Sequence, residues 1–352
     1  MSCYSPLKGW TIGLNDNGKR KMLVTSYNVD HIEFLPDGRF FQSMEVFDPV
    51  KDSGRDCITY FEEIPCGSCT GCRLERSKQW ANRCLLEMQY HESSYFLTIT
   101  YDDDHLPHGT GVLPDTGEII DTHSLRLEDL QKFFKRLRKA YDELYPGDKL
   151  RYFACGEYGD KTARPHYHAI VFGLKLTDLE PYKRCGDYWY YNSSFLSDLW
   201  PFGYVVVGEA NRETAGYVAR YCTKKLYGDD GMVYESLSLK PPFIVMSRKP
   251  GIASQYLADH PESVQQPFLY ESTDKGGIKF RPPKYFQRKF DEFFEDDVDY
   301  VNMRYDQKEE AKFQMKQVRD LLSSQTDLSY LDMLASQEAV LKSKLKKLER
   351  SL

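Results

Sequence analysis

The sequence predicts an α+β fold, with one mainly antiparallel sheet and helices packed on one face of it. Three observations support this class. The predicted elements follow the order strand, helix, strand, strand, helix, strand, helix, which suits such a layer. Residues 95–101 are rich in aromatic and β-branched side chains, as strands are. Residues 127–144 carry apolar side chains at alternating spacings of three and four, which is typical of an amphipathic helix.

Punctuation and periodicity place the remaining elements in order along the chain. Turn residues and short apolar runs predict a helix at 73–91, a loop or small hairpin at 109–124, a hairpin of strands 151–158 and 166–173, a short helix at 195–200, a strand at 203–208 and a helix beginning near 216. The chain is then rich in proline and glycine, and we expect irregular structure to about residue 290.

The 352 residues are expected to form three segments. Residues 1–91 hold a cysteine cluster and a helix, residues 92–290 hold the sheet with a C-terminal extension, and residues 291–352 form an acidic linker and a helical tail.

The formal net charge of −6 counts against nucleic-acid binding, where a basic surface is expected. Much of the acidic charge, however, lies at 291–299, outside the region of the motifs described below. Basic side chains gather at 132–139, at Lys224 and Lys225, and at 281–289. The frequent tyrosines and phenylalanines would fill a core and also stack on unpaired bases.

The N-terminal ten residues lack the apolar segment of a signal peptide, and no apolar run is long enough to span a membrane. The nine cysteines are an odd number and are mostly clustered, so they do not form a disulfide framework. We therefore expect reduced thiols in a cytoplasm and no membrane partner.

Two histidines on one predicted strand provide half of a metal site. His166 and His168 are two residues apart, so both side chains lie on the same face of the strand. An isolated His-x-His is more often a solvated or core pair. Here Glu157, on the partner strand, comes close to His166 if the hairpin register aligns the two faces. Two nitrogens and a carboxylate would suit Mg²⁺ or Mn²⁺ and leave open positions for phosphate and water.

Two tyrosines lie one turn apart on the predicted helix that follows. Tyr217 and Tyr221 fall on the side of the helical wheel opposite the apolar stripe formed by Ala215, Val218, Ala219, Cys222 and Leu226. They are not needed to complete that stripe, although ordinary surface aromatics would show the same pattern. A tyrosine hydroxyl has a pKa of about 10 and needs help to ionise. Lys224, in the same turn as Tyr221, is placed to stabilise phenolate or phosphate and favours Tyr221 for a first cut.

Taken together, the segments 96–101, His166-Tyr167-His168 and Tyr217-x-x-x-Tyr221-x-x-Lys224-Lys225 resemble, in order, the three motifs of HUH endonucleases that initiate rolling-circle replication. The chain looks most like the initiators of small single-stranded DNA phages of the Microviridae, gokushovirus branch. Further resemblance lies at 66–72, 156–159 and 246–252, and it spans about residues 60 to 290.

This resemblance implies a ferredoxin-like nuclease fold, related to the RNA-recognition fold, and site-specific nicking of double-stranded phage DNA through a 5′-phosphotyrosine. A free 3′-hydroxyl would then prime synthesis, and two alternating tyrosines would rejoin the circle. The implied partners are single-stranded and origin DNA, with host helicase and polymerase, in the host bacterial cytoplasm.

The cysteine cluster suggests a second metal. Cys66, Cys69 and Cys72 supply C-x-x-C-x-x-C, and Cys84 or Cys57 would complete a structural Zn²⁺ site. No second C-x-x-C pair is present, and Cys84 also suits a plain core cysteine one turn after Trp80.

Basic side chains beside these motifs are candidates for contacts with DNA. Lys225 follows the tyrosine helix, and Lys135 and Arg136 lie on the basic face of helix 127–144, which would track phosphates or simply be solvated.

Three other readings of the sequence stay open. The chain could be a two-tyrosine transposase or plasmid initiator, a non-enzymatic nucleic-acid-binding zinc protein, or a phage scaffolding protein. A covalent protein–DNA adduct separates the enzymes from the other two.

Overall fold

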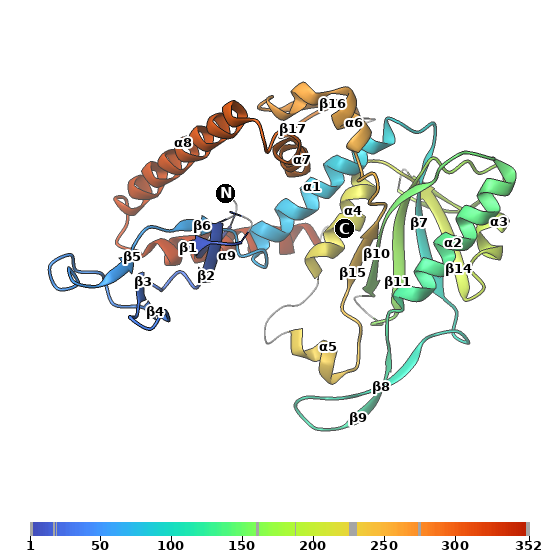
Figure 1. Cartoon of the computed structure of the whole chain (residues 1–352). Helices are drawn as coiled ribbons and strands as arrows, with labels where there is room; N and C mark the ends of the chain where they lie inside the picture. Colours follow the sequence, from blue (N-terminus) through green and yellow to red (C-terminus); the bar gives the residue numbers. More distant parts are fainter. Residues whose placement is uncertain are drawn as a thin grey trace. The chain divides into compact units, whose positions relative to one another are not determined.

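The computed structural model describes residues 3–16, 18, 20–159, 162–186, 188–224, 231–273 and 276–349, with the backbone alone at 185, 221–224 and 346–349. This part of the chain forms two compact units (Figure 1). The larger unit comprises residues 76–306, and the smaller unit combines residues up to 75 with those from 307 onward. The division differs from the three predicted segments because the N-terminal strands and the tail, distant in sequence, build one unit.

A seven-stranded sheet, counted over the described residues, is the centre of the larger unit. Its strands are β7 (Ser94–Tyr101), β10 (Arg151–Tyr158), β11 (Pro165–Phe172), β12 (Leu179–Cys185), β13 (Tyr188–Ser193), β14 (Gly203–Glu209) and β15 (Phe243–Met246). They are arranged in the order β12-β13-β14-β7-β11-β10-β15, and every neighbouring pair is antiparallel. The predicted α+β class and antiparallel sheet are therefore confirmed.

The remaining elements around this sheet are helices and two small hairpins. They are α1 (Thr70–Met88), which begins in the smaller unit, α2 (Leu127–Leu144), α3 (Ser194–Asp198), α4 (Arg212–Lys224), α5 (Met232–Ser236), α6 (Ser254–Asp259), the 3-10 helix η2 (Pro261–Val264), α7 (Lys284–Phe293), the hairpin β8 (His108–Val112) with β9 (Ile119–His123), and the hairpin β16 (Leu269–Thr273) with β17 (Gly276–Phe280).

Helices cover both faces of the sheet, whereas the sequence predicted one (Figure 1). Along β7, Leu97 and Ile99 lie in the core that contains the apolar side chains of α2 and α3. The alternate residue Phe96 lies in a second core with residues of α4. The side chains of a strand alternate between faces, and here both sets are apolar, so each face buries its own helices. Sequence periodicity identified these helices but not the face that each one covers.

Most predicted elements are confirmed to within a few residues, including β7, α2, the β10–β11 hairpin, β14 and α4. Two parts of the sheet were not predicted. The mixed segment after residue 174 forms the hairpin β12–β13, and the segment expected to be irregular contributes β15. β15 has only four residues and pairs with β10, so its own sequence pattern is too short to identify it.

The smaller unit is built from short strands and the helical tail. Its sheets have the orders β2-β1-β6 and β4-β3-β5. Its elements are β1 (Leu7–Leu14), β2 (Arg20–Thr25), β3 (His31–Phe34), β4 (Phe40–Ser43), β5 (Asp56–Ile58), β6 (Glu62–Ile64), α8 (Val298–Ser323), which begins in the larger unit, and α9 (Tyr330–Glu349).

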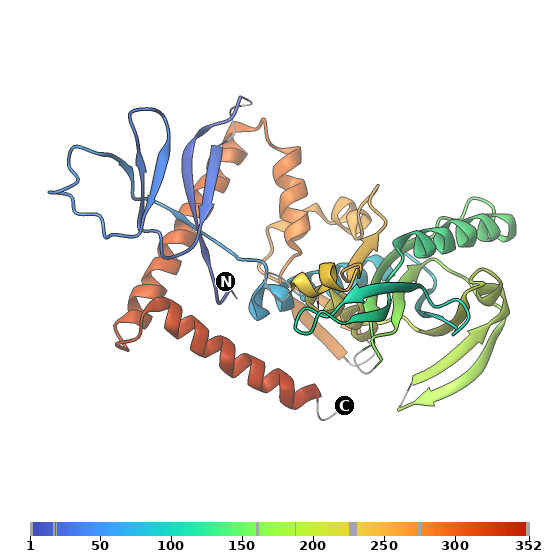
Figure 2. The ribbon, with the colours of Figure 1, turned by 90° about the horizontal axis from the view of Figure 1, so that it is seen from below.

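Ion pairs join the tail to these strands (Figure 2). The Arg319 guanidinium lies 3.0 Å from the Glu63 carboxylate, and the Lys312 amine lies 3.1 Å from that of Glu62. The core beneath contains Trp10, Val29 and Ile32, all almost fully buried. The predicted helical tail is thus present, and it completes the unit that the N-terminal strands begin.

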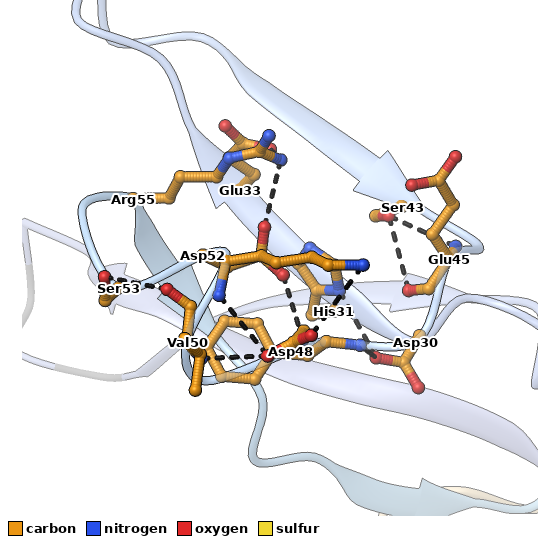
Figure 3. A network of polar contacts seen from close by, with 12 residues as sticks. Asp30, His31, Glu33, Ser43, Glu45, Asp48, Val50, Asp52, Ser53 and Arg55 are labelled. Atoms are coloured by element: carbon orange, nitrogen blue, oxygen red, sulfur yellow. Dashed lines mark hydrogen bonds and ion pairs between the residues drawn. The ribbon is translucent and has the colours of Figure 1, made fainter.

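Short acidic side chains hold the loop between β4 and β5 (Figure 3). The Asp48 carboxylate accepts hydrogen bonds from the backbone N–H groups of Val50 and Lys51, and Asp52 accepts one from the N–H of Asp48. Asp30 accepts another from the N–H of Phe47. These contacts are those of a polar turn, in which side-chain oxygens satisfy backbone donors. Separately, within the described residues no helix is both long and apolar enough to cross a membrane.

Candidate functional site

The register of β10 and β11 brings together the three predicted metal ligands. Glu157 pairs with His166, and Cys155 pairs with His168, so the carboxylate and both imidazoles emerge on one face. One ligand atom from each of Glu157, His166 and His168 lies within 4.8 Å of the other two. The alignment on which the sequence argument depended is therefore present.

Both imidazole rings present the same nitrogen to the same oxygen. The Nε2 atoms of His166 and His168 lie 2.8 and 3.0 Å from Glu157 Oε1. His166 Nδ1 lies 3.0 Å from the backbone carbonyl oxygen of Arg164, which can only accept, so this nitrogen donates. Each neutral ring that donates through Nδ1 leaves the Nε2 lone pair for a metal.

Thr98 supplies the corresponding contact for His168. Its hydroxyl oxygen lies 3.1 Å from His168 Nδ1, because β7 pairs with β11 and sets Thr98 opposite His168. The Arg164 carbonyl and the Thr98 hydroxyl thus orient the two rings. Neither residue was predicted, since the pairing of β7 with β11 is not visible in the local sequence.

Glu157 is buried yet strongly favours its charged form. Burial raises the pKa of this carboxyl, but the hydrogen bonds from His166 and His168, and attraction to them, outweigh burial and lower its pKa to about 2. Its residue is only 2% exposed, whereas the His166 side chain is 18% exposed. The site therefore has a buried anionic base and an accessible rim, which is what binding of a cation and then of a larger substrate requires.

The tyrosine helix α4 packs on the same face of the sheet, against β10, β11 and β15 (Figure 1). Ala215, Val218 and Ala219 of the predicted apolar stripe are fully buried there. Tyr217 faces away from this stripe and is 36% exposed. Its ring lies edge to face against His168, with ring centroids 5.1 Å apart.

Phe96 and Arg220 also lie beside these rings, and neither was predicted as a site residue. The Phe96 ring stacks on His168 at 5.4 Å and meets Tyr217 edge to face at 6.0 Å. The Arg220 guanidinium lies 5.6 Å from the Tyr217 ring centroid. Arg220 is one turn of helix from Gly216 and three residues after Tyr217, so helical spacing alone would have identified it.

Three predicted residues fall where side chains are not described. The backbone of α4 includes Tyr221 and Lys224, but only their helical backbone is described, and Lys225 lies outside the described residues. Tyr221 is one turn after Tyr217 in a helix, as predicted. Its role, and those of Lys224 and Lys225, stay predictions.

Lys135 and Arg136 lie away from this site. They belong to α2, whose apolar side chains pack in the core on the other face of the sheet. Lys135 is exposed, but Arg136 is half-buried and its Nε donates to the Leu199 carbonyl at 2.8 Å. The periodicity of α2 showed a basic face without showing its side of the sheet. Arg136 therefore joins α2 to the end of α3, and neither residue can reach a phosphate held at His166.

The cysteine cluster has a different fourth member from those predicted. Cys66, Cys69 and Cys72 lie together with Cys3, one sulfur from each within 4.8 Å of the others. Cys84 is instead fully buried in the core beneath α4, with Phe153 and Cys155, and Cys57 lies in β5. The prediction of Cys84 as a ligand is wrong because this side of α1 packs on the sheet.

Comparison with known proteins agrees with this arrangement. The family model described as "Replication-associated protein ORF2" matches residues 94–226, which include β7, β11 and α4. The replication-associated protein ORF2 of Spiroplasma virus 4 is 34% identical over 83% of this chain and 86% of its own length. That of Chlamydia phage 1, ORF4, is 41% identical over 46% of this chain and 38% of its own.

VP4 of Bdellovibrio phage phiMH2K, also a replication-associated protein, is 35% identical over 47% of this chain and 50% of its own length. No solved structure matches the chain. The relative from Spiroplasma virus 4 covers most of both sequences, and all three relatives come from Microviridae. The chain therefore belongs to the family of replication-associated proteins of Microviridae phages.

Proposed function

We propose that this protein initiates rolling-circle replication by nicking phage DNA and later rejoining it. The observation that supports the proposal most strongly is the β10–β11 register, which gathers Glu157, His166 and His168 on one face. Tyr217 then contacts this group directly through His168. A nucleophile beside a cation-binding group is the arrangement that phosphoryl transfer to tyrosine needs.

The three side chains fit a divalent metal ion. Two imidazole nitrogens and one carboxylate oxygen suit Mg²⁺ or Mn²⁺, and three protein ligands leave positions for phosphate and water. When bound, such an ion supplies Lewis acidity toward a phosphate oxygen. The chain contributes the orientation of the ligands, because Thr98 and the Arg164 carbonyl fix the outer nitrogen of each ring.

The tyrosines would carry out the covalent step. The hydroxyl oxygen of Tyr217 or Tyr221, having lost its proton, attacks the phosphorus, and the bond from phosphorus to the 3′-oxygen breaks. The DNA 5′ end is then esterified to tyrosine, and the 3′-oxygen takes up a proton to become a hydroxyl group. We infer that Arg220, near the Tyr217 ring, favours the negative charge that develops there.

The second tyrosine would complete the cycle. Host helicase and polymerase extend the 3′-hydroxyl around the circle inside the host cell, and the free tyrosine cuts the regenerated origin. The released 3′-hydroxyl then attacks the first phosphotyrosine, which closes the single strand and frees the first tyrosine.

The test is formation of a covalent adduct. The full chain is incubated with Mn²⁺ and single-stranded oligonucleotides tiled across the phage genome, and the products are separated on a denaturing gel. We expect a protein–DNA band with one origin sequence, and no band with excess EDTA. The double variant His166→Ala/His168→Ala should lose the band and keep most DNA binding.

A matched control is the pair His108 and His123, which face each other across β8 and β9 with ring centroids 4.8 Å apart. Replacing both by Ala should leave the adduct unchanged. An adduct that forms in excess EDTA, or normally in the His166/His168 variant, would contradict the proposal. Metal-independent DNA binding with no adduct would favour the non-enzymatic alternative.

A further inference from the structure

Four cysteines of the smaller unit converge on one point. The sulfurs of Cys3 and Cys66 are 3.7 Å apart, those of Cys3 and Cys69 are 3.9 Å apart, and Cys72 completes the group within 4.8 Å. Cys3 and Cys69 are buried, while Cys66 and Cys72 are half-buried. All four thiols are free, so the cluster is not a pair of disulfides.

These separations match those required by one tetrahedral ion. With zinc–sulfur bonds of about 2.3 Å, the sulfurs at the corners of a tetrahedron are about 3.8 Å apart. The two measured distances lie on either side of that value. Four thiolates in a tetrahedron select zinc or iron, and the hard cations Mg²⁺ and Ca²⁺ prefer oxygen.

Strand pairing explains how Cys3 reaches a motif 63 residues away. β1 and β6 are antiparallel, and Leu7 at the start of β1 pairs with Ile64 at the end of β6. The chain before β1 and the chain after β6 therefore leave the sheet at the same edge. Cys3 precedes this edge and Cys66 follows it, so the pairing of the strands brings their sulfurs together.

Backbone N–H groups point at the sulfurs, as they do around metal thiolates. Cys69 N lies 3.3 Å from Cys66 Sγ, Tyr4 N lies 3.2 Å from Cys69 Sγ, and Cys66 N lies 3.3 Å from Cys3 Sγ. Cys72 lies in the first turn of α1, where the helix dipole favours negative charge.

The charge on one thiol already reflects these donors. Burial raises the pKa of Cys66, but the N–H of Cys69 and the hydroxyl of Ser68 donate to its sulfur, and the pKa falls to about 6. An anionic sulfur is the form that binds zinc.

We propose that Cys3, Cys66, Cys69 and Cys72 bind one structural Zn²⁺, with Cys3 as the fourth ligand. The ion joins the chain before β1 to the start of α1 and so fixes both ends of the β1–β6 pair. It is separate from the proposed nuclease, which needs none of these residues. All four ligands come from the chain, which is the closed coordination of a structural zinc site.

The test is metal content and coordination in the full-length protein. The protein is purified under reducing conditions without chelators, and its zinc and iron are measured by elemental analysis. We expect one zinc per chain, bound to four sulfurs in X-ray absorption spectra. This measurement on the unaltered protein needs no variant to fold.

Variants then identify the ligands. Cys3→Ser should release zinc to a competing chelator with a loss of affinity greater than the about 10–100-fold typical of lost outer contacts. Cys57→Ser and Cys84→Ala are matched controls and should keep one zinc. Zinc-free protein, iron in place of zinc, fewer than four sulfur ligands, or loss of zinc in Cys84→Ala with retention in Cys3→Ser would each overturn the proposal.

Discussion

The His168 imidazole lies edge to face against the Tyr217 ring, with centroids 5.1 Å apart and planes inclined by 82°. His168 belongs to the middle of a seven-stranded sheet and Tyr217 to the helix that covers it. A buried side chain and a partly exposed one therefore meet where the rim of the site opens. This contact joins the candidate cation ligands to the candidate nucleophile.

The two tyrosines should have separable roles. Tyr→Phe keeps the ring and removes the attacking oxygen, so Tyr217→Phe and Tyr221→Phe should both fold. Each single variant should nick once and fail to close circles, because the second cut needs a free hydroxyl. The double variant should form no adduct. Peptide mapping of trapped adducts identifies the residue used, and circle closure by a single variant would argue against alternation.

Loss of the Thr98 hydroxyl should weaken metal binding. Thr98→Val keeps the shape and removes the contact that orients His168 Nδ1. We expect the Mn²⁺ concentration for half-maximal nicking to rise about 10–100-fold, with nicking recovered at high Mn²⁺. Thr110→Val, at an exposed position in β8, is the matched control. An unchanged metal dependence in Thr98→Val would remove Thr98 from the site.

Tyr167 should matter for stability and not for chemistry. It lies between the two histidines in sequence, but its hydroxyl is on the opposite face, 2.7 Å from that of Tyr101 and hydrogen-bonded to the backbone of Arg126. Tyr167→Phe leaves buried polar groups without this partner and should cost about 1–3 kcal/mol of unfolding free energy. Urea denaturation measures the loss, and adduct formation per folded molecule should not change.

The same buried tyrosines predict instability at alkaline pH. Burial raises the pKa of Tyr167 to about 12, and burial with the neighbouring Tyr167 and Asp129 raises that of Tyr101 further. Unfolded tyrosine ionises at about pH 10, so the folded state keeps its advantage below that pH and loses it as the pH rises through about 12. Unfolding free energies between about pH 8 and about pH 12 should show this fall, and Tyr167→Phe should reduce its slope.

Local patterns predicted the site better than they predicted its surroundings. Alternation along β11 and the short turn after β10 are properties of neighbouring residues, so Glu157, His166 and His168 could be grouped from the sequence. The order of strands in the sheet depends on pairings between distant segments, and Thr98 was missed for that reason. The same limit hid Cys3 and left the side of the sheet covered by α2 undetermined.

The discontinuous smaller unit has a consequence for synthesis on the ribosome. Residues 76–306 form the larger unit and can fold once they have emerged, but the N-terminal strands must wait for the helices from residue 307 onward. At about 5–20 residues per second, the ribosome needs roughly 12–46 s to make the intervening segment. During that interval the strands would expose unpaired edges and apolar side chains, and premature termination of translation would leave them permanently incomplete.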